Sequence, residues 1–304
     1  MSTSRIGVVA LAGLIGVAVA WAAPRNGSRQ LTAEEIILKN VAARGGLEAW
    51  RKIRTAMWVG HIESGNPSAP LIPFVLEMKR PDKARFETRA GEQTSVHIFD
   101  GTRGWKMRGA AGGTPGVQPY TPEELRAARD AQTLDGPLID HQAKGIAVAL
   151  AGMDEVEGHK AYRLMVQLPS GSTRHVWIDA HTFLDLKYNR EARAAGGQPG
   201  TVSVYYRNYR RIDGLQIPMT FEMGSGSGRP TQRMVIDTVT LNPLLPDQRF
   251  AGPGGPGALS AGPANPDGRP FPMSPHAPRR PLRLGGPVVP GPSGANADSS
   301  TPAR

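Results

Sequence analysis

The chain has 304 residues, a formal net charge of +10 and no cysteine. Without cysteine it can form no disulfide and cannot carry a thiol-linked lipid at its N-terminus. The basic residues are dispersed, without the block of Lys and Arg interleaved with aromatic side chains that a nucleic-acid groove needs. We therefore expect no nucleic-acid partner and only a mild attraction to anionic surfaces.

The first 22 residues have the three-part layout of a secretory signal. Arg5 precedes an apolar stretch from Ile6 to about Ala20, and Ala20-Trp21-Ala22 fits the small-x-small cleavage rule. The alternative is an uncleaved anchor helix, but the stretch is shorter than the roughly 20 apolar residues that span a bilayer. We expect residues 1–22 to be a cleaved signal peptide, which predicts a soluble protein in the periplasm.

The last 54 residues, 251–304, contain 13 Pro and 10 Gly and almost no periodic apolar content. Such a composition cannot bury enough apolar surface to offset the loss of chain entropy, so we predict a disordered tail. The alternatives for its role are a tether, a docking strip for a Pro-recognising partner, and a dispensable extension. Residues 30–250 remain as a single folded domain.

Two helices are predicted ahead of the first strand. Thr32 and Glu35 form a capping box, and apolar residues follow at helical spacing until Gly45-Gly46. A second short helix is predicted over about Leu47–Ile53, whose apolar residues lie along one side. These two pieces make a helical lead-in to the sheet.

Short runs that alternate apolar and polar residues between Thr55 and Leu241 predict a large antiparallel sheet. Side chains two apart share a face of a pleated strand, so the apolar sets should converge on one surface. The clearest runs are 72–80, 83–89, 94–99, 160–168 and 215–223. They predict the apolar lining of a ligand site: Phe74, Leu76, Met78, Phe86, Ile98, Leu164, Val166, Met219 and Phe221.

Tight turns join these runs as a meander of about ten strands. Arg80-Pro81-Asp82-Lys83 and the acidic-Gly pairs at 100–101, 157–158 and 213–214 suit hairpins. A polar interruption lies between Ala110 and Lys144, where a Gly-rich loop is followed by a predicted helix from Thr121 to about Ala131. A second short helix is predicted at 138–142. Helices inserted here can cover the apolar concave side of the sheet.

No constellation of catalytic or metal-binding residues accompanies the predicted sheet. The seven His residues form no close pair at ligand spacing, and solvated positions explain the nearest cluster, His175, Asp179 and His181. The Ser residues lack a Gly-x-Ser-x-Gly elbow, and Gly224–Gly228 lacks the Lys of a phosphate loop. We therefore predict no catalytic residues, no metal site and no cofactor.

The apolar face itself is then the best candidate for function. Trp58, Trp105 and Trp177 either line a ligand cavity or pack in a core. A face with so many Met, Phe and Leu residues, and few long helices to cover it, should leave part of its area to an apolar guest. The pattern favours binding over chemistry.

A group of turn and strand-end segments is distinctive as a set: Arg80–Phe86, Phe99–Trp105, Leu134–Leu138, Trp177–Asp179 with Leu184–Lys187, Tyr209–Gly214 with Ile217-Pro218, and Leu241–Pro243 with Phe250. Together they resemble the LolA-like family of outer-membrane lipoprotein-sorting proteins. The resemblance spans nearly all of 30–250. It implies an α+β fold in which a strongly curved antiparallel sheet forms an open half-barrel of about ten or eleven strands, with helices covering the concave face.

The resemblance implies two functions, and a third hypothesis is compared with them. The first is a non-enzymatic periplasmic carrier or binder of the acyl chains of lipoproteins or other lipids. The second is a lipid-sensing or scaffolding protein that engages an inner- or outer-membrane partner. The third is a secreted enzyme of uncharacterised type. We expect the first, with lipid or acylated lipoprotein as partner and a monomeric protein.

Overall fold

The computed structural model describes residues 30–66, 68–109, 116–131, 134–193, 199–225 and 231–252. The predicted signal peptide and residues 253–304 of the predicted tail lie outside these ranges. Thr32 begins the compact unit that contains the described helices and strands. No described helix is long and apolar enough to cross a membrane.

Two helices open the unit, as predicted. Helix α1 (Ala33–Ala43) begins at Thr32, whose hydroxyl accepts a hydrogen bond from the Glu35 amide while the Glu35 carboxylate accepts one from the Thr32 amide. Helix α2 (Leu47–Lys52) follows after Gly45 and Gly46, which both have positive φ. Glycine adopts this backbone conformation without steric cost, so the pair permits the sharp change of direction.

The remaining chain is mostly antiparallel sheet. The strands are β1 (Thr55–Ser64), β2 (Ile72–Lys79), β3 (Lys83–Ala90), β4 (Gln93–Phe99), β5 (Gly104–Arg108), β6 (Gly116–Pro119), β7 (Ala147–Val156), β8 (His159–Gln167), β9 (Thr173–Asp179), β10 (Asp185–Arg193), β11 (Pro199–Ile212), β12 (Leu215–Ser225) and β13 (Gln232–Leu241). Their order across the sheet is β6-β5-β4-β3-β2-β1-β13-β12-β11-β10-β9-β8-β7.

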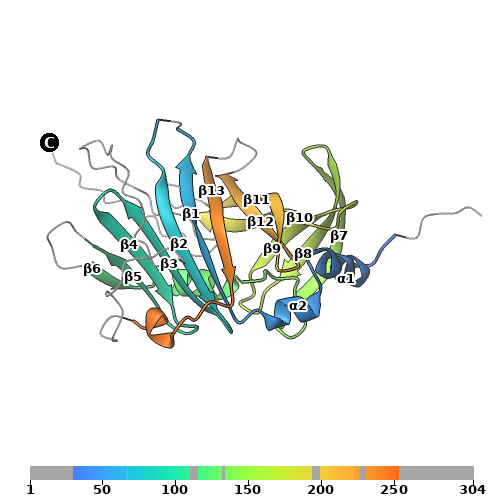
Figure 1. The fold of residues 1–304 in the computed structure, drawn as a ribbon. Coiled ribbons are helices and arrows are strands. Elements are labelled where there is room, and N and C mark those ends of the chain that lie inside the picture. The colour runs from blue at the N-terminus through green and yellow to red at the C-terminus, as the bar shows by residue number, and fades with distance from the viewer. Residues whose placement is uncertain are drawn as a thin grey trace, which may run out of the picture. The chain divides into compact units, whose positions relative to one another are not determined.

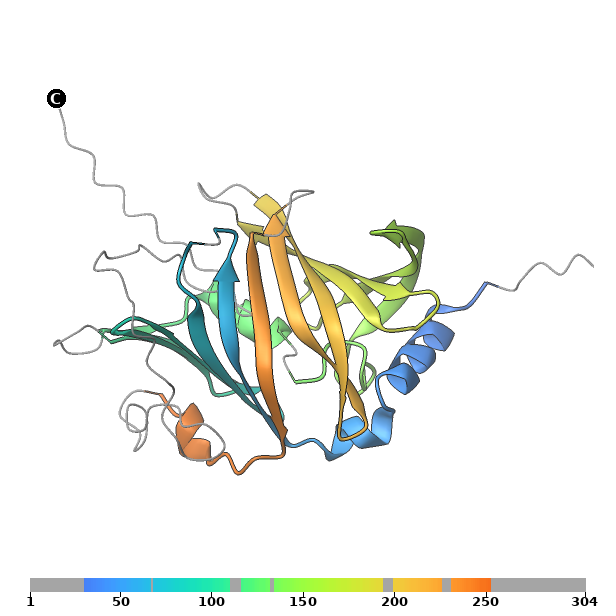
Figure 2. The same ribbon diagram turned by 45° about the horizontal axis from the view of Figure 1, so that its top comes forward.

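The strand order is a meander on each side of β1. Strand β1 pairs with β2 on one side and with the last strand, β13, on the other, so this contact between distant segments joins the two halves. The described strands form an open sheet whose edges are β6 and β7. In both Figure 1 and Figure 2 the sheet bends around helix α3 (Pro122–Asp130), which lies behind β1 and β13.

The count of 13 strands in the described chain exceeds the predicted ten or eleven. The difference arises at the two edges of the sheet. Strands there do not bury one face, so their sequences need not alternate apolar and polar residues. All four residues of β6 are exposed, and this segment belongs to the stretch that was predicted as loop and helix. The ten residues of β7 include only one buried side chain, that of Val156.

Helix α3 confirms the predicted helix at Thr121, including a second capping box between Thr121 and Glu124. The second short helix predicted at 138–142 is wrong, because residues 134–145 form consecutive turns. Asp140 and Gly145 within them have positive φ, which a helix does not allow. Leu138 and Ile139 are nevertheless completely buried.

The segment after β13 covers the outer face of β2 and β3. The short helix η1 (Asp247–Phe250) places Phe250 in the core, and the Arg249 Nε donates to the buried Glu77 carboxylate at 2.7 Å. Gly252, which was assigned to the tail, lies against the Trp105 ring.

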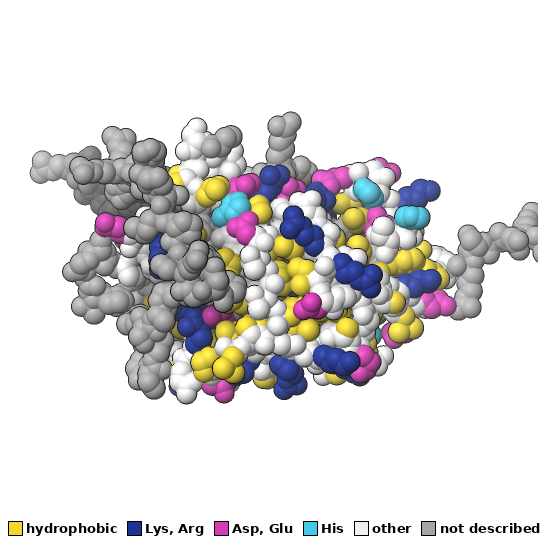
Figure 3. Space-filling model, viewed as in Figure 1, with side chains coloured by type: hydrophobic (Ala, Val, Ile, Leu, Met, Phe, Trp, Pro, Cys, Tyr) yellow, Lys and Arg dark blue, Asp and Glu magenta, His cyan; other side chains and the backbone are white. Residues whose placement is uncertain are grey.

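On the face viewed in Figure 1, basic and acidic side chains are interspersed with apolar ones, as Figure 3 shows.

We predict that Gly60→Ala destabilises the fold by about 1–3 kcal/mol, because the new methyl group overpacks the junction of the two halves. A Cβ at Gly60 would overlap the Val235 carbonyl and lie 2.9 Å from the Phe74 ring. Urea denaturation measures the effect. Gly116→Ala on β6, where a Cβ meets nothing within 4 Å, is the control; equal effects of the two changes would contradict this role of Gly60.

Candidate functional site

The ladder pairs define one continuous apolar face. Residues directly opposite each other in antiparallel strands point to the same side of the sheet. In one half of the sheet, Leu164 pairs with Val176, Val176 with Tyr188, and Tyr188 with Val204. All four are buried. This row crosses from β8 to β11.

The same face continues through β1 into the other half. Trp58 pairs with Leu76, and Leu76 with Phe86. The Trp58 ring stacks on Phe221 with centroids 5.7 Å apart, and Phe221 contacts Tyr206 at 5.4 Å. These rings therefore connect the two halves across β1 and β13.

Eight of the nine predicted lining residues share this face, and Ile98 does not. Phe86 pairs with His97, so His97 and Phe99 occupy the face in β4. Ile98 pairs with Arg85 and packs with Val96 and Met107 on the opposite side. The parity argument assigned Ile98 to the wrong face because β4 carries apolar residues at both parities, and the ladder register decides between them.

The apolar face is covered in this structure. Each of the nine predicted residues is at most 5% exposed. Met78 and Phe86 line a cavity of about 50 Å³ together with His97, Phe99 and Tyr120. Such a volume holds only a few water-sized groups. The other predicted residues line no described cavity, so the partly vacant apolar hollow that we expected is closed.

Polar contacts hold α3 over this face. The two buried side chains of the helix are carboxylates, Glu124 and Asp130. Lys106 Nζ on β5 donates to Glu124 Oε1 at 2.7 Å, and Ser170 Oγ donates to Asp130 Oδ2 at 2.8 Å. Arg174 Nη2 on β9 donates to the Asp130 carbonyl at 2.7 Å. The helix thus bridges β5 and β9, from opposite halves of the sheet.

Burial acts to raise the pKa of Glu124, but hydrogen bonds from Lys106 and Thr121 outweigh it and lower the pKa below its ordinary value. Glu124 is therefore ionised at neutral pH and forms a charge-assisted bond with Lys106. We call α3 together with residues 134–145 the cover. Its helical part is anchored mainly by such bonds.

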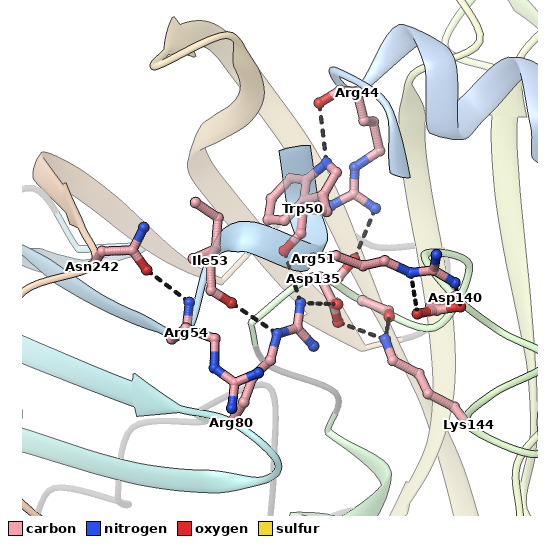
Figure 4. Close-up of polar contacts among 11 residues, drawn as sticks. Arg44, Trp50, Arg51, Ile53, Arg54, Arg80, Asp135, Asp140, Lys144 and Asn242 are labelled. Atoms are coloured by element: carbon pink, nitrogen blue, oxygen red, sulfur yellow. Dashed lines mark hydrogen bonds and ion pairs between the residues drawn. The ribbon is translucent and has the colours of Figure 1, made fainter. Parts of the chain in front are cut away.

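A second set of contacts fixes residues 134–145 to the rest of the unit (Figure 4). The buried Asp135 carboxylate accepts hydrogen bonds from Arg80 Nη2 at 2.7 Å and from Lys144 Nζ at 2.5 Å. Its main-chain carbonyl accepts one from Arg44 Nη1 at 3.0 Å. Arg80 also donates to the carbonyls of Trp50 and Ile53. Asp135 therefore joins the cover to α2 and to the β2–β3 turn.

Three donor groups on the concave face have no hydrogen-bond partner within the described part of the chain. Trp58 Nε1 is buried without a hydrogen bond, and so are Nε and Nη2 of Arg190. Arg190 shares the parity of Tyr188 on β10, and burial lowers its pKa with a smaller contribution from the nearby charge of Arg174. A buried donor without an acceptor costs free energy, and it marks a position where an acceptor atom of a ligand could bind.

His97 contributes a partly buried, neutral imidazole to the same face. Its ring lies 6.1 Å from the Tyr120 ring, and its Nδ1 has no hydrogen-bond partner. Burial, followed by the charge of Lys106, lowers the pKa of His97 to about 4. No sequence motif marks this residue. Its pairing with Phe86 is the signal that places it on the concave face.

The other sequence candidates occupy structural positions. Asp179, expected to be solvated, is buried and accepts hydrogen bonds from His159 and from the amides of His181 and Thr182. Trp105 and Trp177 lie on the face opposite to Phe86 and Val176. No group of three or more metal-ligating side chains occurs among the described residues.

Comparison with known proteins gives matches of fold. No family model matches the chain, and no curated protein matches it. Solved structures similar to it are a LolA superfamily protein from Nitrosomonas europaea and a putative outer-membrane lipoprotein-sorting protein domain from Vibrio parahaemolyticus. The first is 13% identical with a TM-score of 0.49, covering 73% of this chain and 99% of its own. The second is 11% identical with a TM-score of 0.49, covering 71% and 94%.

A third similar structure is a DUF1329 family protein from Desulfovibrio piger, 12% identical with a TM-score of 0.47, covering 72% of this chain and 97% of its own.

We predict that Asp135→Asn lowers the free energy of unfolding by about 3 kcal/mol, because the partly buried cations of Arg80 and Lys144 lose the buried carboxylate that neutralises them. Hydrogen exchange in residues 134–145 should accelerate. Asp140→Asn is the matched control, since Asp140 pairs with the half-exposed Arg51 in the same segment. That change should cost about 1 kcal/mol or less. Equal effects would show that the Asp135 contacts do not hold the cover.

We predict that stability falls on acidification through His97. The folded protein holds this ring neutral down to pH about 4, whereas the unfolded chain binds a proton near the ordinary value of 6.5. The contribution of His97 to the free energy of unfolding is fully present above pH 6.5 and is lost as the pH falls from 6.5 to 4. The loss amounts to about 2 kcal/mol at pH 5. Urea midpoints at pH 7.5 and pH 5 test it. His97→Gln should show a smaller loss, and an unchanged loss would contradict the assignment.

Proposed function

We propose that this protein binds the apolar part of an amphiphile, such as the acyl chain of a lipoprotein or another lipid, between the concave face of the sheet and the cover. It acts in the periplasm as a carrier and performs no chemistry on its ligand. The observation that supports this most directly is the contrast between the two surfaces. A continuous apolar face is covered by a helix whose buried side chains are charged.

Because of this contrast, a ligand can take the place of the helix in the cover. Helix α3 offers the sheet only Leu125 and small Ala side chains, none of them fully buried. An acyl chain that takes its place would bury more apolar area than the helix does. At about 25 cal/mol per Å², burial of roughly 400 Å² of acyl chain contributes about 10 kcal/mol before ordering costs. The anchoring polar groups can return to water when the helix moves.

The orphaned donors support a ligand with a polar end. Trp58 Nε1 lies on the concave face beside Phe221 and has no acceptor. The ester or carboxyl oxygens of an amphiphile supply acceptors of the kind that an indole N–H needs. If the face were only a structural core, nothing would compensate the free-energy cost of burying this N–H group without an acceptor.

A sensing role is the second candidate, and the Asp135 contacts favour it. Asp135 joins the cover to Arg44 at the end of α1 and, through Arg80, to α2. Displacement of the cover by a ligand would therefore alter the surface formed by these helices, where Leu38 is exposed. A membrane partner that contacts this surface would respond to occupancy.

The test of binding uses the full chain purified from its own periplasm. Native mass spectrometry should detect co-purified amphiphile, and the delipidated protein should take up a fluorescent fatty acid. Absence of both would contradict the proposed function.

We further predict that Glu124→Gln accelerates fatty-acid uptake at least threefold, because it weakens the bond to Lys106 that holds α3 in place. Stopped-flow fluorescence measures the rate. Glu155→Gln, an identical change at an exposed position of β7, is the control. If both variants take up the probe at the wild-type rate, α3 is not the part that moves.

A further inference from the structure

A second, much larger hollow lies at the end of the concavity. It has a volume of about 940 Å³, whereas the apolar cavity beneath the cover has about 50 Å³. Its walls come from α3, from the turns that contain Pro81, Gly101 and Ser170, and from Arg54 ahead of β1. The hollow is therefore built where one end of the curved sheet meets the cover.

Cationic side chains dominate this hollow. Five of them line it, against the two carboxylates of Asp82 and Asp130: Arg54, Arg80, Arg126, Arg129 and Lys144. Asp130 already accepts a hydrogen bond from Ser170. Burial raises the pKa of Asp82 above its ordinary value, which makes its negative charge less favourable. The hollow thus carries an excess of positive charge.

The cations differ in how far they are neutralised. Arg80 and Lys144 share the Asp135 carboxylate, and Arg129 donates to the Thr102 carbonyl. The guanidinium groups of Arg54 and Arg126 are exposed and form no ion pair with a described carboxylate. Two guanidinium groups from separate elements therefore border the hollow with their hydrogen-bonding capacity unused.

The cationic hollow adjoins the small apolar cavity beneath the cover. Arg80, Pro81, Asp82 and Lys144 line both the hollow and the small cavity that contains Met78 and Phe86. A single ligand can therefore occupy both, with its apolar part on the concave face and its polar part among the arginines. Planar guanidinium groups match the oxygens of phosphate and carboxylate by paired hydrogen bonds.

We propose that the hollow binds the anionic headgroup of the amphiphile, with Arg54 and Arg126 as headgroup ligands. This inference rests on the proposed function and adds a selectivity to it: the protein distinguishes anionic from zwitterionic amphiphiles that carry identical acyl chains. The apolar face supplies affinity for the chains, and the hollow selects the headgroup.

Direct binding measurements test this selectivity with the full chain. The probes are dioctanoyl phosphatidylglycerol, dioctanoyl phosphatidylcholine, and glycerol phosphate or inorganic phosphate without acyl chains. We expect the wild-type protein to bind the phosphatidylglycerol about tenfold more tightly than the phosphatidylcholine, as charge-assisted hydrogen bonds imply. The preference should shrink at high salt, because exposed charges are screened.

The double variant Arg54→Gln with Arg126→Gln should lose most of this preference. Arg210→Gln with Arg211→Gln removes the same charge from exposed positions of β11 outside the hollow and should retain it. Equal binding of the two lipids by the wild-type chain, or equal loss in both double variants, would overturn the headgroup assignment alone.

The remaining outcomes separate the source of the anion and the underlying function. If free phosphate binds as tightly as phosphatidylglycerol and depends on the same two arginines, the hollow is a phosphate site and the link to the acyl chain is wrong. If the wild-type chain binds neither lipid, the proposed function fails, and the headgroup assignment fails with it.

Discussion

An open curved sheet with one apolar face is stable only if that face is shielded from water. The way in which this chain shields it determines the other features of the structure. The described chain provides α3 and the turns at 134–145 for this purpose. The turns contribute fully buried apolar side chains at Leu138 and Ile139, whereas α3 contributes buried carboxylates. The face is therefore closed partly by packing and partly by ion pairs. Ion pairs lose less on exposure to water than apolar side chains do.

This division separates a fixed part of the structure from a displaceable one. The β1–β13 pairing and the ring contacts of Trp58, Phe221 and Tyr206 hold the two halves of the sheet together. The cover is attached to both halves through Lys106 on β5 and Arg174 on β9, and to the helical lead-in through Asp135. A movement of α3 breaks these few contacts and leaves the sheet intact. In the function that we propose, a ligand displaces α3 while these strand contacts stay in place.

The sequence predicted the elements well where local chemistry determines them. The capping box at Thr32 located the start of α1, and Pro122 with the following acidic residues located the start of α3. The parity of β2, β8 and β12 identified their inward residues. Prediction failed where the answer depends on pairing between strands. The face of Ile98 is set by the register of β4 against β3, and β6 is a strand only because β5 lies beside it.

The site was predictable only in part for the same reason. Arg54, Arg80, Arg126 and Lys144 are far apart in the sequence, and no motif links them before the chain is folded. His97 and Asp135 likewise acquire their burial from distant partners. The dispersed basic residues predicted only a mild attraction to anionic surfaces, whereas the fold gathers several of them at one end of the concavity. Conversely, eight of the nine predicted apolar residues do share one face, but the sequence did not show that the cover fills it.

The most direct test of the central claim is photo-crosslinking of the full chain with a fatty acid that carries a photoreactive group near its methyl end. Peptide mass spectrometry then identifies the labelled residues. Our account predicts labels on concave-face residues such as Leu76, Phe86 and Phe221, together with the inner side of α3. Labels confined to the outer face around Ile98 and Met107, or no specific label at all, would contradict it.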